Sequence, residues 1–226
     1  MSLDSVHTLI GYAHSCAMYV GCTWVCNPWP VQNPSSGRRH TRDRILDAAV
    51  EVLGMTPDAG MGEVASAAGV VRRTVYGYFP SRSDLVLALA RRAVDEIEAV
   101  LAEEAPAGKA ADVAWADFVA RLWPLVHRYR VMVVLRRGEF GEHIHALLGQ
   151  VERALADLVR RGQDAGVLGR HLPAGVLSQT AWSAVFTIAD DAPSRDVDAA
   201  AVTVATMLLL GVPQSRATAL AERSVS

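Results

Sequence analysis

The sequence predicts an all-α fold. Hydrophobic residues make up 51% of the 226 residues, and alanine, the residue with the strongest helix preference, is abundant. Apolar residues recur with a spacing near 3.6 in successive segments, and glycine or proline separates those segments. Long runs in which β-branched and polar residues alternate are missing from the sequence, so we expect no sheet. A chain of this length accommodates one or two domains with a sizeable core.

Residues 1–38 differ in composition from the rest of the chain. No Asp, Glu, Lys or Arg occurs from Ser5 to Gly37, and prolines interrupt the second half of this stretch as they do in linkers. We expect a poorly ordered extension, or a start codon placed too far upstream. A membrane anchor is the alternative, although the apolar part barely reaches the ~20 residues that a spanning helix needs.

All three cysteines lie within these first residues. Their C-x5-C-x3-C spacing matches no standard zinc site, so we expect no metal there. No disulfide framework can brace the rest of the chain, which fits a protein of the reducing cytoplasm.

A first helical domain is expected at residues 39–97. Thr41 is a suitable N-cap for its first helix, and Asp43 lies in the first turn, where a carboxylate interacts favourably with the helix dipole. After the proline at position 80, Ser81 is expected to cap a long helix that ends near Glu104.

Residues 60–79, GMGEVASAAGVVRRTVYGYF, carry the most specific pattern in the chain. Four apolar residues share one face of a short helix, namely Met61, Val64, Ala65 and Ala68. Gly69 then breaks the period and is free to adopt a positive φ. A second short helix with a basic exposed side follows, from about Val71 to Tyr78. A helix, a glycine-containing turn and a basic helix make a helix-turn-helix, in which the second helix enters the major groove of DNA.

The same stretch resembles the TetR family of bacterial transcriptional regulators. The resemblance runs through V-A-x-x-A-G-V-x-x-x-T-V-Y-x-Y-F, from Val64 to Phe79, and the P-S-R-x-x-L that follows, and it covers about Thr41–Leu89. It implies a three-helix DNA-binding domain at the N-terminus, followed by a larger helical domain that binds a ligand and dimerises. Two residues depart from the family pattern: Val71 stands where Ser or Thr usually caps the recognition helix, and Arg73 stands where Gly is common.

The charge distribution agrees with a DNA-binding head, although the net charge of −2 does not indicate one. From Arg38 to Arg92 there are nine arginines and six acidic residues, an excess of +3, so the remainder carries −5. Phosphate attraction is local, so a basic head on an acidic body suits a DNA reader, although an excess of this size is also common on ordinary surfaces. We expect six side chains to contact DNA: Arg42, Arg72, Arg73, Thr74, Tyr76 and Tyr78. The two adjacent arginines are expected at guanine edges or phosphates, and the hydroxyl groups at the backbone.

Residues 98–214 are expected to form a helical ligand-binding and dimerisation domain, followed by a tail at 215–226. An all-helical body with aromatic residues on facing helices can enclose a small-molecule pocket. Each such residue taken singly is more often plain core, so the pocket is what the resemblance implies. The candidate lining residues are Trp115, Phe118, Leu122, Trp123, His127, Met132, His143, Trp182 and Phe186.

Signals of catalysis are weak. Glu142 and His145 have the Glu-x-x-His spacing of di-iron bundles, but such sites need a second copy of this motif, and the sequence contains none. Nucleotide-binding loops and ordered nucleophile triads are also missing from the sequence. We therefore expect no enzyme, no metal and no cofactor.

The resemblance implies a homodimeric regulator, a repressor that a small-molecule effector releases from a pseudo-palindromic double-stranded operator. Two apolar segments, Leu177–Ala189 and Val197–Leu210, are the expected dimer interface, and no membrane partner is expected. Two alternatives stay open at this point. One is an activator or a regulator without a small ligand. The other is a helical small-molecule-binding protein, or an enzyme, whose head no longer reads DNA.

Overall fold

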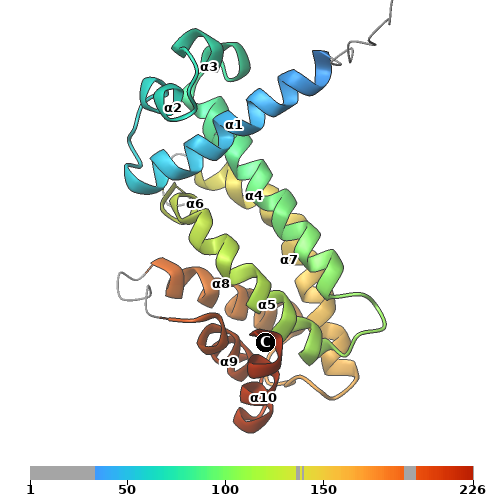
Figure 1. Cartoon of the computed structure of the whole chain (residues 1–226). Coiled ribbons are helices and arrows are strands. Elements are labelled where there is room, and N and C mark those ends of the chain that lie inside the picture. Colours follow the sequence, from blue (N-terminus) through green and yellow to red (C-terminus); the bar gives the residue numbers. More distant parts are fainter. Residues whose placement is uncertain (1–33, 136–137, 139, 191–196, 226) are drawn as a thin grey trace, which may run out of the picture.

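The computed structural model describes residues 34–135, 138, 140–190 and 197–225. The extension expected at residues 1–38 falls largely outside this part, as do the three cysteines. Within the described residues the chain forms ten α-helices and no strand, which confirms the all-α prediction. The three N-terminal helices, of which the second and third are short, form a head at one end, and the remaining helices form a longer body (Figure 1).

The head consists of α1 (Pro34–Met55), α2 (Met61–Ala67) and α3 (Arg72–Tyr78). Its core is made by side chains from all three helices and the residue after α3, including Ile45, Leu46, Leu53, Val64, Val75 and Phe79. Because α1 begins at Pro34, the N-cap prediction for Thr41 is wrong. Thr41 lies inside the helix, where its hydroxyl donates to the carbonyl of Gly37 at 3.0 Å. A threonine inside a helix satisfies its hydroxyl in this way, four residues back.

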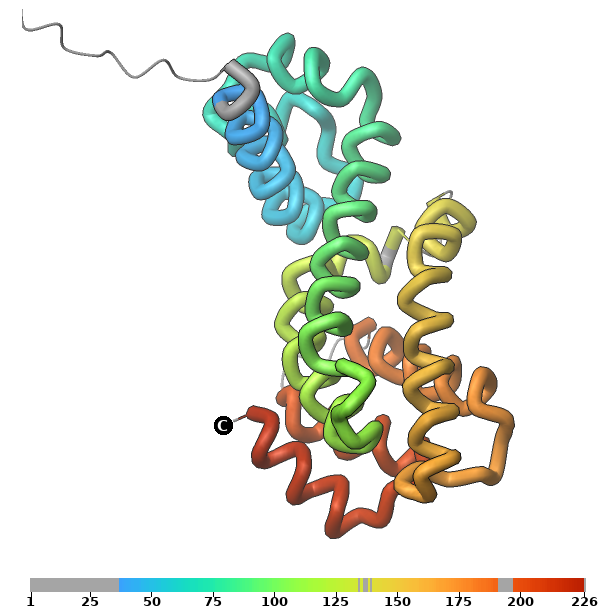
Figure 2. The backbone as a smooth tube through the Cα atoms, turned by 90° about the vertical axis from the view of Figure 1, so that its right-hand side faces the viewer, coloured from blue at the N-terminus to red at the C-terminus, as the bar shows by residue number. Residues whose placement is uncertain are grey.

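The long helix α4 (Arg82–Glu104) joins the head to the body. Figure 2 shows it descending from the head along the length of the body. Its start follows the sequence prediction, because the Ser81 hydroxyl accepts a hydrogen bond from the backbone N–H of Asp84 at 3.1 Å. Its buried face points to both units, with Leu85 and Leu89 near the head and Ile97 and Leu101 further down.

The body contains five further helices around a core of large aromatic and aliphatic side chains. They are α5 (Ala111–Arg128), α6 (Arg130–Leu135), α7 (Gly141–Asp164), α8 (Ala174–Asp190) and α9 (Ala199–Leu209). Pro124 does not end α5, which continues to Arg128. None of the helices in the described residues is long and apolar enough to cross a membrane.

The last helix, α10 (Gln214–Val225), occupies the segment expected to be a tail. It packs on α5 and α9 at the end of the body farthest from the head (Figure 1). Its apolar face is buried, with Leu220 3% exposed. Arg216 also donates two hydrogen bonds, of 2.9 and 3.0 Å, to the buried carboxylate of Asp112 on α5.

Candidate DNA-reading helix and ligand cavity

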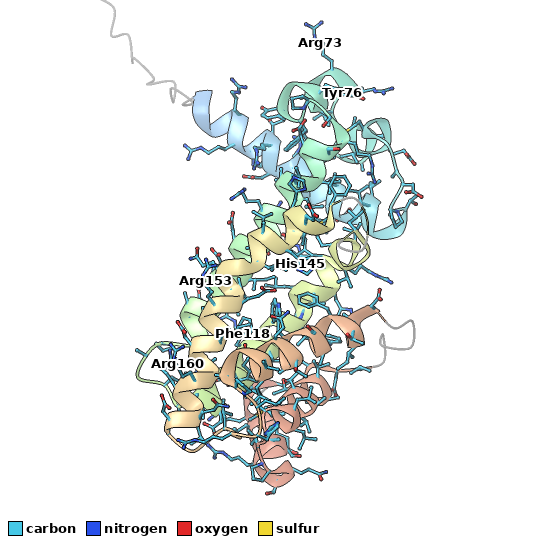
Figure 3. The ribbon with its side chains drawn as sticks, turned by 180° about the vertical axis from the view of Figure 1, so that it is seen from behind. Arg73, Tyr76, Phe118, His145, Arg153 and Arg160 are labelled. Atoms are coloured by element: carbon cyan, nitrogen blue, oxygen red, sulfur yellow. The ribbon has the colours of Figure 1, made fainter. Side chains whose placement is uncertain are left out.

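Helix α3 presents Arg73 at the outermost point of the head. Its side chain is exposed and points away from the body (Figure 3). In the described part of the chain this guanidinium makes no ion pair or hydrogen bond. Arg73 therefore keeps its full hydrogen-bonding capacity for an external partner.

Arg72, its neighbour, is held differently. Its Nη2 donates to the hydroxyl of Tyr76 one helical turn on, at 3.1 Å, and its guanidinium lies 5.4 Å from the centroid of that ring. The hydrogen bond with Tyr76 raises the pKa of Arg72, so its charge is fixed. Arg72 and Tyr76 thus form a braced pair along the exposed side of α3, beside the extended Arg73.

The remaining predicted DNA contacts differ in exposure. Arg42 on α1 is exposed, and its guanidinium lies 5.4 Å from the ring centroid of Phe79. Thr74 and Tyr78 are half-buried. The ring centroids of Tyr78 and Phe79 are 6.5 Å apart, and the guanidinium of Arg38 lies 5.8 Å from the centroid of the Tyr78 ring. The six predicted side chains lie on α3 and α1 of the same head, but their contact with DNA stays a prediction.

Several arginines that contribute to the basic excess of the head have internal structural roles. Arg44 donates to the carbonyl of Ala68 at 3.1 Å, which fastens the end of α2 to α1. Arg82 donates to the carbonyl of Ala59 at 3.4 Å and to that of Pro57, and so closes the loop before α2. The charge excess alone therefore overstates the positive surface available to phosphates.

Val71 precedes α3 at the position where the sequence predicts that a capping Ser or Thr is missing. Its backbone is extended, with φ −75° and ψ 149°, and it provides no side-chain hydrogen bond to α3. The apolar side chain is 70% exposed beside the first turn of the recognition helix. Apolar side chains in this position can contact the methyl group of thymine in the major groove. The signal in the sequence was the substitution itself, but its exposure required the fold.

The body encloses an apolar cavity between α4, α5, α6, α7 and α8. Its volume is about 50 Å³. Twelve of the described residues line it: Ala90, Ala93, Val94, Ile97, Leu125, Val126, Tyr129, Met132, Val133, Ile144, Leu148 and Phe186. Among the residues predicted to line a pocket, Met132 and Phe186 are here. The side chains from α4 were not predicted, because small residues such as Ala90 and Ala93 read only as helix formers.

The other predicted pocket residues lie elsewhere. Two tryptophans are buried with their N–H groups satisfied: Trp115 donates to the hydroxyl of Thr206 at 3.2 Å, and Trp123 to the carbonyl of Val197 at 3.1 Å. Phe118 stacks on Trp182 with centroids 6.2 Å apart, and Leu122 is fully buried. These side chains form the core that supports the cavity, and their contact with an effector stays a prediction.

The two predicted histidines differ in environment. His127 is half-buried, with its ring edge-on to Trp123 at 4.5 Å between centroids. Burial and the charge of Arg130 lower the pKa of His127, so it is neutral at pH 7. His143 is exposed near the start of α7. Within the described residues, no group of three or more His, Cys, Asp or Glu side chains could hold a metal ion.

A shallow groove runs along the exposed side of α8 and reaches α9. Its lining is a mixture of apolar and small polar side chains: Gly175, Val176, Gln179, Thr180, Ser183, Ala184, Thr187, Ile188 and Leu209. Large apolar side chains are exposed here, with Val176 at 51% and Leu209 of α9 at 39%. Adjacent exposed apolar residues on two neighbouring helices are typical of a protein–protein contact surface.

Comparison with known proteins agrees with this arrangement. Residues 45–89 match the family model described as bacterial regulatory proteins, tetR family. The HTH-type transcriptional repressor LfrR of Mycolicibacterium smegmatis is 45% identical over 80 residues, which is 35% of this chain and 42% of LfrR. The chain therefore aligns in sequence with less than half the length of this curated relative.

Solved structures extend the likeness to the body. LfrR in complex with proflavine superposes with a TM-score of 0.60 at 27% identity, covering 77% of this chain and 96% of that one. The fatty acid degradation regulator FadR of Bacillus halodurans gives a TM-score of 0.65 at 20% identity, covering 75% and 94%. This second likeness concerns the fold alone.

A helix-turn-helix head carried by a long connecting helix on an all-helical body defines a class of regulator built from two units. The family model, the relative and the shared fold agree on which class this is. Residues 45–89 match the tetR family model and the LfrR structure shares the fold of the body, so the chain is similar to the TetR family of bacterial transcriptional regulators.

Proposed function

We propose that this chain is a homodimeric transcriptional repressor that leaves a pseudo-palindromic operator when a small apolar effector enters its body. The observation that carries the DNA-binding part is the extended Arg73 on the outer side of α3, within residues 45–89, which match the tetR family model. Operator DNA lies in the cytoplasm, so we expect the protein to work there.

Selection of binding sites from a random pool of duplex DNA tests this part. Two heads related by a two-fold axis should enrich an inverted repeat, with half-sites separated by about one helical turn or a multiple of it. Affinity for the selected duplex should fall steeply with salt, because phosphate contacts release counterions. Enrichment of no sequence above the starting pool would contradict the proposal and favour a helical binding protein whose head does not read DNA.

The effector is proposed to be uncharged and largely apolar. Eleven of the twelve residues that line the cavity are aliphatic, Met or Phe, and only Tyr129 brings a polar group. A charged ligand would lose its hydration without gaining an ionic partner, which costs several kcal/mol. The fold itself tolerates varied ligands, since LfrR was solved with proflavine and a FadR from Bacillus subtilis with stearoyl-CoA.

The size of the cavity supports a response to the effector. Ligand pockets typically measure ~300–1,000 Å³, whereas this cavity measures about 50 Å³. An effector must therefore displace side chains and separate the helices that enclose the cavity. One of these is α4, which enters the head, so enlargement of the cavity moves the element that carries the DNA-reading unit.

The neutral dye N-phenyl-1-naphthylamine is a suitable probe of the cavity. It should bind with increased fluorescence, and its sulfonated relative 8-anilinonaphthalene-1-sulfonate should bind at least about tenfold more weakly, because its charge finds no partner. Ala93→Phe fills the cavity and should abolish dye binding. Ala146→Phe places the same bulk on the exposed side of α7 and should leave it unchanged. Tighter binding of the sulfonated dye would contradict the proposed ligand class.

A dimer through α8 and α9 is the proposed assembly. The exposed apolar residues of these helices and the groove along α8 supply the surface, and a stable interface buries more than roughly 1,000 Å². Small residues on the outer side of α9 allow close helix approach: Ala201 is exposed, and Val204 and Ala205 are half-buried.

A further inference from the structure

An ionic cluster joins the head to the body. Asp47 on α1 accepts a hydrogen bond from Arg92 of α4, with Nη2 and Oδ1 2.7 Å apart. The same Oδ1 atom lies 3.4 Å from Nη2 of Arg128, at the end of α5. One carboxylate of the head thus contacts two guanidinium groups that come from two helices of the body.

A second carboxylate, Glu96, holds the body side of the cluster. Its Oε2 lies 3.2 Å from Arg128 Nη1, and its Oε1 lies 3.3 Å from Arg92 Nε. The hydroxyl of Tyr129 donates to the same Oε1 at 2.7 Å. The two arginines therefore lie between Asp47 and Glu96, and each of them contacts both acids.

Tyr129 has a second role, because its side chain also lines the apolar cavity. The residue is 4% exposed. Burial, followed by the hydrogen bond to Glu96, raises the pKa of its hydroxyl, so it remains protonated and donates. Tyr129 is thus the polar group of the cavity, and its proton is committed to the cluster that holds α1.

We infer that Asp47, Arg92, Glu96, Arg128 and Tyr129 form a head–body cluster that fixes the orientation of the DNA-reading head, and that Tyr129 connects this cluster to the content of the cavity. Displacement of Tyr129 by an effector would remove a hydrogen bond from Glu96, release the two arginines from their shared geometry and loosen α1. This inference rests on the proposed function for its purpose, but its geometry is independent of DNA.

The strength of the cluster suits a reversible device. Asp47 and Arg128 are about half exposed, with side-chain fractions of 52% and 41%, and pairs of this kind are individually weak. In addition, Nη1 of Arg92 is buried without a hydrogen-bond partner among the described residues. A cluster that is only partly satisfied favours one orientation of the head without locking it.

Hydrogen exchange of the full-length protein tests the inference without any ligand or DNA. Three variants are compared with the wild type: Asp47→Asn, Tyr129→Phe and the double variant. Tyr129→Phe keeps the ring in the cavity and removes only the hydroxyl. Exchange of the buried amides of α1 should be about two- to fivefold faster in each single variant, the range that weak ion pairs and single hydrogen bonds support. The double variant should not exceed the faster single variant, because both changes break one cluster.

The matched control is Asp157→Asn. Asp157 has a similar exposure, 55%, and pairs with Arg160 on the outer side of α7 at 2.6 Å, far from the head (Figure 3). It loses the same charge and should leave exchange in α1 unchanged. Glu96→Gln is a second probe of the body side and should behave like Tyr129→Phe.

Two results would overturn the inference. One is that the amides of α1 exchange in Tyr129→Phe at the same rate as in the wild type. The other is that the acceleration in the double variant equals the product of the accelerations in the two single variants. These outcomes are distinct from failure of the proposed function, which would appear as enrichment of no DNA sequence by the wild type. A chain that reads no DNA can still show the coupled exchange, and a DNA-binding chain can lack it.

Discussion

The head and the body of this protein differ in how the residues of their candidate sites are distributed along the sequence. In the head, the residues that define the helix-turn-helix are contiguous, from Val64 to Phe79, and they form the two helices and the turn that the pattern predicts. In the body, the cavity is assembled from five helices that extend from Ala90 to Phe186 along the chain. A local function leaves a local pattern, whereas an enclosed site leaves almost none.

The difference has a physical origin. A recognition helix must present particular side chains at fixed spacing to one external surface, so its requirements fall on neighbouring residues. A cavity exists where large side chains are missing from a packed core. That depends on which helices meet and in which register, and the residues concerned look like ordinary apolar positions of amphipathic helices.

The largest effect is expected from a single charge on the body surface. Ala205→Glu would bury an unpaired carboxylate in the proposed α8–α9 interface, which costs several kcal/mol and should weaken the dimer at least ~100-fold. Sedimentation velocity over a range of concentrations measures this. Ala219→Glu, an exposed position on α10, is the control that keeps the dimer. A stable Ala205→Glu dimer would place the interface on another surface.

The next effect concerns the head, where substitutions of two nearby residues should change DNA binding in different ways. Arg73→Ala should weaken operator binding by about 1–3 kcal/mol and flatten the preference at one base pair per half-site, if its guanidinium reads a guanine edge. Tyr76→Phe removes the hydroxyl that accepts from Arg72, 3.1 Å away, and should weaken binding to all sequences by a similar factor.

Binding-site selection with both variants at two salt concentrations separates these roles. A contact between Arg73 and phosphate alone would leave the base preference unchanged in Arg73→Ala and lower the salt slope by about one unit per head. That result would make Arg73 an electrostatic contact and would leave the exposed Val71 as the candidate for contact with a base.

The sequence predicted local features well and distant pairings poorly. The Ser81 cap with Asp84 at its third position was readable, as was the positive φ of Gly69, which is 62°. The Arg92–Glu96 pair has a helical i, i+4 spacing that could have been noticed. Its connections to Asp47 and Arg128 could not, because they depend on how three helices cross.

The aromatic residues of the body show that the sequence does not separate side chains that line a cavity from side chains of the core. Trp115 and Trp182, predicted to line a pocket, are 0% and 2% exposed within the core and do not line the apolar cavity, so their contact with an effector stays a prediction. A large apolar side chain can line a pocket or fill the core, and its size alone does not distinguish the two. The start of α1 was misjudged for a different reason, since Pro34 is tolerated in the first turn of a helix although prolines and glycines usually mark linkers.

A smaller effect is expected where α10 joins the body. Arg216→Ala leaves the carboxylate of Asp112, 3% exposed, with the backbone N–H of Val113 as its one remaining donor among the described residues. We expect the free energy of unfolding to fall by about 1–2 kcal/mol, which allows for the half-exposed arginine. Denaturant titration measures the change.

Arg223→Ala is the matched control on the same helix. Arg223 also binds an aspartate of α5, and its side chain is 51% exposed against 53% for Arg216. Its partner Asp117 keeps Lys109 at 2.7 Å and a hydrogen bond from Ser224. The loss should therefore stay below about 0.5 kcal/mol, and an equal effect of the two substitutions would show that burial of the carboxylate is unimportant here.

The smallest effect is a pH dependence of body stability that comes from His127. Burial and the nearby Arg130 lower the pKa of this imidazole in the folded state, whereas the unfolded chain titrates near the ordinary value of 6.5. Between the two pKa values the unfolded state binds more protons, so the free energy of unfolding falls as the pH drops below about 6.5 and levels off below the folded pKa.

Thermal unfolding at pH 7.5, 6.5 and 5.5 should show this loss in the wild type. In His127→Gln the same pH steps should produce a smaller loss, because the neutral side chain stays half-buried beside Trp123 without a proton to gain. An identical pH dependence of the two proteins would assign the acid sensitivity to carboxylates such as Asp117. Burial raises the pKa of Asp117, but its hydrogen bonds with Lys109, Ser224 and Arg223 and the charge of Lys109 together lower it.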